Sequence, residues 1–154
     1  MNSTIETVKD TLNSLTETLK DGEQGFRTAA KDVKSPELAQ LFGTYAQQRA
    51  EFAANLQARV AALGASVEKS GSISGAMHRG WMNVKAALST NEPQAVLEEA
   101  ERGEDIAVAA YRKALEHHDL DSDTRALIQA QASAVQQVHN RVRDLRDSGK
   151  FKKK

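Results

Sequence analysis

The feature that most constrains the fold is a helical spacing of apolar residues that runs through nearly the whole chain of 154 residues. Apolar side chains recur at steps of three and four, which places them on one stripe of an α-helix. The chain has 2 prolines, and each stands where a helix should begin. Because proline disrupts helix interiors, this placement predicts long, uninterrupted helices.

Start and stop signals divide this pattern into four long helices. Ser35-Pro36-Glu37 and Asn91-Glu92-Pro93 supply helix starts, with a capping residue before a proline in the first turn. Gly64 and Gly149 supply helix ends. The helices are expected at about 3 to 34, 36 to 63, 93 to 117 and 122 to 148.

The connections predict the topology. Helices one and two, and helices three and four, are joined by short polar turns, so each pair should be an antiparallel hairpin. The stretch from Gly64 to Pro93 is longer and predicts a short helix through the amphipathic run of Met77, Trp81, Val84 and Leu88. Such a crossover can span the bundle lengthwise. We predict an all-α, ferritin-like up-down-down-up four-helix bundle with a long crossover containing a short helix.

Length and composition limit the class of protein. We expect one domain, residues 1–149, followed by a disordered basic tail, residues 150–154. Basic and acidic residues number 21 each, so no general field attracts nucleic acid or a membrane surface. The sequence has no cysteine. Because its first ten residues are polar and no apolar run reaches membrane length, we expect neither a signal peptide nor a membrane span. A cytoplasmic protein without nucleic-acid or membrane partners is expected.

A weak internal repeat points to polar residues inside the bundle. Gly22-Glu23 in the first helix matches Gly103-Glu104 in the third, and Gln48 in the second matches Gln131 in the fourth. At about 100° per residue, both glutamates and Gln131 fall near the centres of their apolar stripes. Arg49 also lies on the inner face. The predicted buried polar layer comprises Glu23, Gln48, Arg49, Glu104 and Gln131.

These positions match a ferritin-like di-iron centre only in part. Such a centre uses Glu on two helices and Glu-x-x-His on the other two. Glu23 and Glu104 fill the first two places, but the others read Gln48-Arg49-Ala50-Glu51 and Gln131-Ala132-Ser133-Ala134, without histidine. Arg49 also adds a permanent positive charge. The metal motif is therefore degraded.

The polar layer admits two interpretations. In the one we favour, Arg49 bridges Glu23 and Glu104, the two glutamines complete the hydrogen bonds, and no cofactor is needed. In the other, Glu23, Glu104 and His139 bind Fe, Mn or Zn, joined by Glu51 if that side chain turns inward.

Four parts of the chain carry a family resemblance: Lys20-Asp21-Gly22-Glu23-Gln24-Gly25-Phe26-Arg27-Thr28-Ala29-Ala30, His78-Arg79-Gly80-Trp81 with Lys85-Ala86-Ala87-Leu88, Glu101-Arg102-Gly103-Glu104-Asp105, and His139-Asn140-Arg141-Val142-Arg143-Asp144-Leu145-Arg146-Asp147. At these segments the chain resembles an uncharacterised bacterial family of ferritin-like four-helix-bundle proteins, a domain of unknown function. The resemblance implies the fold and a ferritin-like ancestry, but no reaction, substrate or cofactor. Where the wider ferritin-like group carries Glu-x-x-His, this chain departs from it, which speaks against oxidase or iron-storage activity.

Other patterns are interpreted as structural. His117-His118-Asp119 stands at a helix end, where histidines meet the helix dipole favourably. Trp81 is expected to seal the core rather than to form a ligand pocket with His78. A charge run is expected to solvate the outer face of the third helix: Glu98, Glu99, Glu101 and Arg102.

These observations favour a non-enzymatic structural or protein-interaction role, with stress physiology suggested by ferritin-like analogy alone. The alternative is a metal-binding or redox protein with a carboxylate site in the bundle core. A third possibility is a subunit of a larger assembly, because small-residue faces around Gly22, Gly25 and Gly103 allow close helix approach. The expected partner is an unidentified protein or a second copy of the chain.

Overall fold

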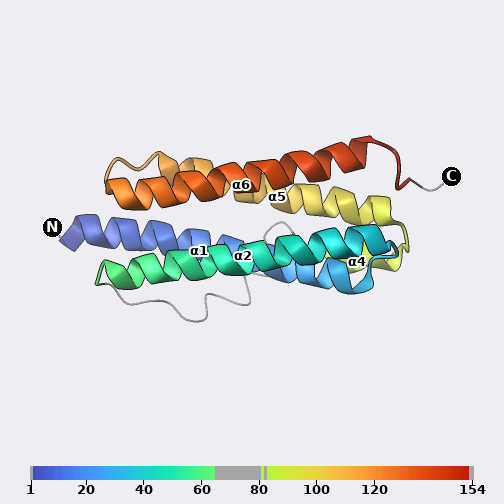
Figure 1. Cartoon of the computed structure of the whole chain (residues 1–154), viewed down its shortest axis with the longest axis horizontal. Helices are drawn as coiled ribbons and strands as arrows, with labels where there is room; N and C mark the ends of the chain where they lie inside the picture. Colours follow the sequence, from blue (N-terminus) through green and yellow to red (C-terminus); the bar gives the residue numbers. More distant parts are fainter. Residues whose placement is uncertain (1, 65–80, 82, 153–154) are drawn as a thin grey trace.

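The protein is a bundle of four long helices (Figure 1). The computed structural model describes residues 2–64, 81 and 83–152. The long helices are α1 (Asn2–Asp32), α2 (Pro36–Ala62), α5 (Pro93–Leu115) and α6 (Ser122–Asp147), and the short helix is α4 (Val84–Ser89). The four predicted long helices are confirmed, with ends shifted by a few residues. No helix in this described part is long and apolar enough to cross a membrane.

Local contacts at the helix ends explain why these ends could be predicted from the sequence. The hydroxyl of Ser35 accepts a hydrogen bond from the backbone N–H of Leu38 at 3.2 Å, and Pro36 occupies the first turn of α2. Gly64 and Gly149 have positive φ angles of 79° and 75°, which a glycine adopts without a steric penalty. These residues end α2 and α6.

Asp121 both starts α6 and ties it to α2. Its carboxylate accepts hydrogen bonds from the backbone N–H of Thr124 at 3.1 Å and from Nη2 of Arg59 at 2.7 Å. Burial alone would raise the pKa of Asp121, but the hydrogen bonds from Thr124 and Arg59 hold it below its ordinary value. The second hairpin is therefore anchored to the first at this end of the bundle.

The directions of the helices confirm the predicted up-down-down-up order. In Figure 1, α1 and α6 run from left to right, whereas α2 and α5 run from right to left. Helix α2 ends at the left and α5 begins at the right, a separation that needs a long crossover. Within the predicted crossover helix, Val84 and Leu88 lie in α4, whereas Met77 falls outside the described residues.

Two apolar clusters fill the interior, one in each half of the bundle. The first gathers side chains such as Leu12, Leu19, Leu56, Tyr111 and Ile128. The second gathers side chains such as Phe26, Phe42, Trp81, Leu97 and Val142. Along each helix, the residues between these clusters fall near the middle of the bundle. Arg49 and Glu104 of the predicted polar layer lie at this level, between the two clusters on α2 and α5.

Trp81 is a core residue, as expected, and two glycines make room for it. Its side chain is 3% exposed, and its ring packs edge-on against Phe26 with centroids 4.8 Å apart. A Cβ placed on Gly25 would lie 2.1 Å from the Trp81 ring, and one on Gly103 would lie 2.4 Å from it. These glycines therefore face the interior. The expectation that they form a small-residue face for assembly is wrong, because Trp81 covers them.

The start of the basic tail is ordered against the bundle. Nζ of Lys150 donates to the carboxylate of Glu37 at 2.9 and 3.1 Å, and Phe151 packs against the second apolar cluster. An apolar ring and an ion pair thus connect these two residues of the tail to the bundle. Residues 153–154 lie outside the described part.

Candidate functional site

A buried ion pair occupies the middle of the bundle. Arg49 on α2 donates from Nη1 to Oε1 of Glu104 at 2.8 Å and from Nη2 to Oε2 at 2.7 Å. The side chains of Arg49 and Glu104 are 1% and 0% exposed. Two parallel hydrogen bonds of this kind are the strongest way for arginine to hold a carboxylate. Each charge is thus neutralised by the other inside the core.

The remaining surroundings of Arg49 fix its orientation. Its Nε donates to Oε1 of Gln48 at 3.3 Å, and its guanidinium carbon lies 5.5 Å from the centroid of the Phe26 ring. A Cβ built on Gly22 of α1 would lie 3.4 Å from Nη1, so Arg49 crosses directly over this glycine. Helices α1, α2 and α5 all contribute to the cradle.

Glu23 does not join this pair, and the predicted bridge from Arg49 to both glutamates is corrected. The carboxylate of Glu23 accepts from Nη2 of Arg27 at 2.5 Å, one turn along α1, and its side chain is 26% exposed. The residue of α1 that faces Arg49 is its neighbour Gly22. One position corresponds to about 100° around a helix, which moves Glu23 from the interior to the edge.

Gln131 is buried as expected but serves another contact. Its side chain is 2% exposed, accepts a hydrogen bond from the hydroxyl of Tyr111 at 2.7 Å, and donates to the backbone oxygen of Phe52 at 3.2 Å. Burial raises the pKa of Tyr111, an effect opposed by the positive charge of Arg49 and aided by the negative charge of Glu104. Gln131 thus links α5, α6 and α2 beside the ion pair.

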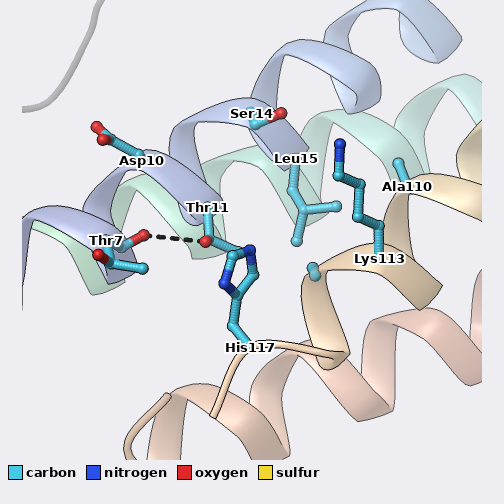
Figure 2. Close-up of a pocket in the computed structure, with 9 residues that line it drawn as sticks. Thr7, Asp10, Thr11, Ser14, Leu15, Ala110, Lys113 and His117 are labelled. Atoms are coloured by element: carbon cyan, nitrogen blue, oxygen red, sulfur yellow. Dashed lines mark hydrogen bonds between the residues drawn. The ribbon is translucent and has the colours of Figure 1, made fainter. Parts of the chain in front are cut away.

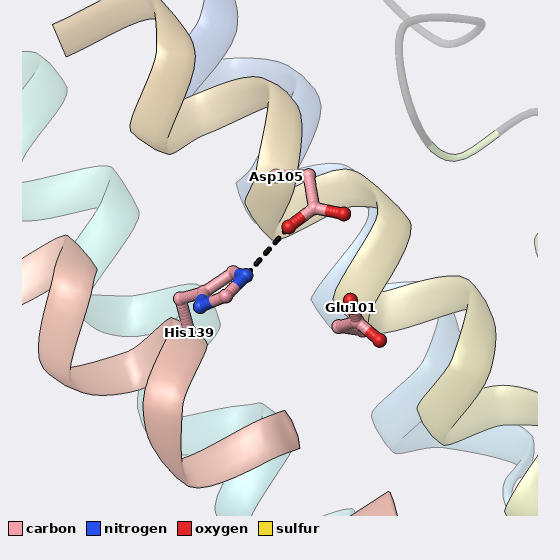
Figure 3. Close-up of side chains that lie close together, drawn as sticks. All are labelled: Glu101, Asp105 and His139. Atoms are coloured by element: carbon pink, nitrogen blue, oxygen red, sulfur yellow. Dashed lines mark hydrogen bonds and ion pairs between the residues drawn. The ribbon is translucent and has the colours of Figure 1, made fainter. Parts of the chain in front are cut away.

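The four metal candidates from sequence are not brought together. Glu51 is exposed, Glu23 pairs with Arg27, and Glu104 is held by Arg49. His139 turns instead toward α5, where its Nε2 lies 2.5 Å from Oδ1 of Asp105 (Figure 3). Because these side chains point to different places, they do not form the predicted metal site in the bundle core.

His139 belongs to a different group of potential ligands. Donor atoms of Glu101, Asp105 and His139 all lie within 4.8 Å of one another, the one such group of three or more in the described ranges. Figure 3 shows both carboxylates on one helix and the imidazole on the facing helix. The side chains of His139 and Glu101 are each 15% exposed, and that of Asp105 is 57% exposed. The group therefore lies at the rim of the α5–α6 contact.

Sequence reasoning placed Glu101 in a solvated charge run and did not single out Asp105. The available signal was the spacing of four residues between these acids, combined with a histidine on the neighbouring helix. Glu99 was also expected to be solvated as part of this charge run, but its side chain is only 2% exposed. Its Oε2 accepts a hydrogen bond from the backbone N–H of Asn83 at 2.8 Å, just before α4. Glu99 therefore holds the crossover against α5.

A groove between α1 and α5 is the other concave feature of interest (Figure 2). It has a volume of about 490 Å³, and its lining includes Asp10, Thr11, Lys113 and His117. The hydroxyl of Thr11 donates to the backbone oxygen of Thr7 at 2.9 Å, so it is engaged within its own helix. Acidic and basic groups are mixed along the walls, and no cluster of reactive groups converges there.

Most of the chain matches a known protein-family model. Residues 7–117 match the model of a domain of unknown function, DUF2383. The chain belongs to this family. The match includes α1, α2, α4 and α5 and therefore both partners of the buried ion pair. The predicted membership in a family of unknown function is confirmed.

The fold of the DUF2383 chain is similar to that of a solved ferritin-like protein. A mutant of Dps1 from Mycobacterium smegmatis superposes with a TM-score of 0.74 at 18% sequence identity, covering 93% of this chain and 97% of that chain. At this identity the likeness concerns the fold alone. No curated protein matches the chain. This is therefore a ferritin-like helical protein of the DUF2383 family.

Proposed function

We propose that this protein is a non-enzymatic ferritin-like bundle that acts through association with another protein or with further copies of itself. The observation that carries the proposal is the bidentate pair of Arg49 and Glu104 in the bundle core. It lies where a ferritin-like bundle would hold its metal ions, so the interior acts as a structural element rather than a redox centre.

Electrostatics supports this view of the core. A dication beside Glu104 would also lie beside the guanidinium, at a cost of about 4 kcal/mol per unit of ion charge at 4 Å and an intermediate dielectric constant. Binding would have to break two short charge-assisted hydrogen bonds and leave Arg49 unpaired in the core. Gln48 cannot compensate, because a neutral amide is a weak ligand.

The packing around the pair supports a structural role as well. Trp81 fills the space between Gly25 and Gly103, and the ring of Phe26 covers Arg49. A substrate could reach the pair only by displacing these buried side chains. We therefore place the activity of the protein on its surface, where contacts with other chains are made.

An aerobic Fe(II) oxidation assay tests the non-enzymatic part of the proposal. Fe(II) is added to the intact chain, to Glu104→Gln and to the matched surface variant Asp105→Asn, and Fe(III) formation is followed by absorbance. The proposal predicts the same rate for all three proteins as for an unrelated helical protein. Faster oxidation by the intact chain that disappears in either variant would overturn it and would identify the residue responsible.

Light scattering over a range of protein concentrations addresses the association part. A defined oligomer identifies a second copy of the chain as the partner. A monomer at every concentration requires a different protein, which crosslinking in cells followed by mass spectrometry should reveal. A monomer without a reproducible crosslinked partner would contradict the proposed association.

A further inference from the structure

We propose that Glu101, Asp105 and His139 form a binding site for one divalent transition-metal ion, with zinc as its best fit, on the rim between α5 and α6. This site lies outside the bundle core, and it does not depend on the proposed non-enzymatic role. The observation that carries it is the convergence of two carboxylates and one imidazole, with donor atoms within 4.8 Å of one another (Figure 3).

The helical spacing makes the two carboxylates a pair. Glu101 and Asp105 are four residues apart on α5, so they lie one above the other on the same face. His139 reaches the same place from α6, which packs against α5. Rigid helices on both sides fix the three backbone positions before any ion binds, which lowers the ordering cost of binding.

The donor set is suited to a borderline metal ion. Imidazole nitrogen and carboxylate oxygen are both donor types that zinc accepts, and the same set also suits Mn²⁺ and Fe²⁺. Ligand atoms in a tetrahedral zinc site lie about 3.3 Å apart, given metal–ligand bonds of about 2.0 Å. The contact between His139 and Asp105, now 2.5 Å, would open by less than 1 Å. Glu101 would close by changing its side-chain rotamer.

The contacts of His139 orient its ring so that Nε2 points toward the two carboxylates. Its Nδ1 lies 3.5 Å from Oδ1 of Asn140, and its Nε2 lies against Oδ1 of Asp105. Both ring nitrogens thus face side-chain oxygens, one from the following residue on α6 and one from α5. With Nδ1–H donating to Asn140, Nε2 carries the lone pair that a metal ion needs.

Arg146 limits the affinity of the site. Its guanidinium forms an ion pair with Glu101, and it also donates from Nε to Asp147 at 2.9 Å. Arg146 therefore competes with the metal ion for one carboxylate. The structure predicts that replacing Arg146 by glutamine will strengthen binding severalfold, because it removes this competing charge.

Calorimetric titration of Zn²⁺ into the full chain tests the site, after removal of any affinity tag and of bound metal with a chelator. We expect one Zn²⁺ per chain, with an affinity at least about tenfold weaker in His139→Gln and in Asp105→Asn. The matched control is His118→Gln, which replaces an exposed histidine and should bind as the unaltered chain does. Circular dichroism of each variant verifies that the helices are intact.

Two outcomes would overturn the proposal. One is the absence of stoichiometric Zn²⁺ binding in the unaltered chain. The other is binding that persists in His139→Gln, or that disappears in His118→Gln, which would assign it to the histidines after α5. The Glu104→Gln variant should still bind Zn²⁺ at the rim, because that site does not use the buried pair. Failure of the zinc site can therefore be distinguished from failure of the proposed function.

Discussion

Glu104 and Asp105 are adjacent on α5, yet they lie in contrasting environments. The side chain of Glu104 is fully buried and held at both oxygens by Arg49. The side chain of Asp105 is 57% exposed and touches the imidazole of His139. These neighbouring residues therefore differ in their partners: Glu104 is held by a permanent internal cation, and Asp105 contacts an imidazole at the surface.

The difference shows how the bundle can keep ferritin-like geometry without a ferritin-like core. A guanidinium stays charged at all relevant pH values, so the interior charge needs no bound ion. At the rim, water can hydrate the carboxylates whether or not a metal ion is present. Metal binding at the rim should therefore vary without unfolding the protein, whereas removal of one member of the interior pair leaves a buried charge without its partner and should destabilise the fold.

The largest expected effect comes from breaking the interior pair. Arg49→Met leaves Glu104 buried without its cation and should lower the free energy of unfolding by about 3–5 kcal/mol. Chemical denaturation followed by circular dichroism measures this change.

The double variant Arg49→Met with Glu104→Leu is the control for that experiment. Because both charges are then absent, its stability should return to within about 1 kcal/mol of the unaltered chain or exceed it. A single variant as stable as the unaltered protein would show that the pair does not matter for the fold.

The packing of the interior gives the next effect. Gly25→Ala would place a methyl group against the ring of Trp81 and should cost about 1–3 kcal/mol through overpacking. Gly43→Ala is the matched change on α2, where a Cβ meets nothing within 4 Å. That variant should be more stable by about 0.5–1 kcal/mol, since alanine favours the helix. Equal thermal midpoints for the two variants would contradict the tight fit around Trp81.

Much of the fold could be predicted from sequence because its signals are local. Ser35-Pro36 starts a helix through its own hydroxyl and ring, and Gly64 and Gly149 end helices through their own backbone angles. The crossover followed from the length of chain between two recognisable helices. The contact of Phe151 with the second apolar cluster could not be predicted, because it depends on a surface formed by distant residues.

The site was predictable only as far as a single helix determines it. The inward positions of Arg49 and Glu104 followed from the phase of their apolar stripes, and both are buried. Glu23 was misplaced by one position, about 100° around the helix, because the residue of α1 that faces Arg49 is Gly22. The contact of His139 with Asp105 depends on the rotation of α5 relative to α6, which the period of either helix alone does not specify.

The free energy of unfolding should depend on alkaline pH through the buried Tyr111, with a smaller effect than that of the preceding variants. Burial raises the pKa of Tyr111 in the folded state above its ordinary value of 10.0, so the fold favours the protonated phenol. The corresponding stability is complete below pH 10 and is lost as the pH rises above it. Tyr111→Phe should cost about 1 kcal/mol at neutral pH, through its bond to Gln131, and should lose stability less steeply above pH 10. Parallel curves of unfolding free energy against pH would contradict this account.

The smallest effect on stability belongs to the rim. Without metal, His139→Gln and Asp105→Asn should each change the free energy of unfolding by less than about 1 kcal/mol, because partly exposed ion pairs contribute little. With saturating Zn²⁺, the unaltered chain should gain thermal stability that both variants lack. If either metal-free variant lost as much unfolding free energy as Arg49→Met, the proposed difference between the rim and the interior would be contradicted.

Anomalous diffraction from crystals grown with Zn²⁺ tests the central claim most directly, because it locates the ion. The account predicts a peak between His139, Asp105 and Glu101, with Arg49 still paired to Glu104 by two hydrogen bonds. A peak beside Glu104 in the core, with Arg49 displaced from it, would contradict the account.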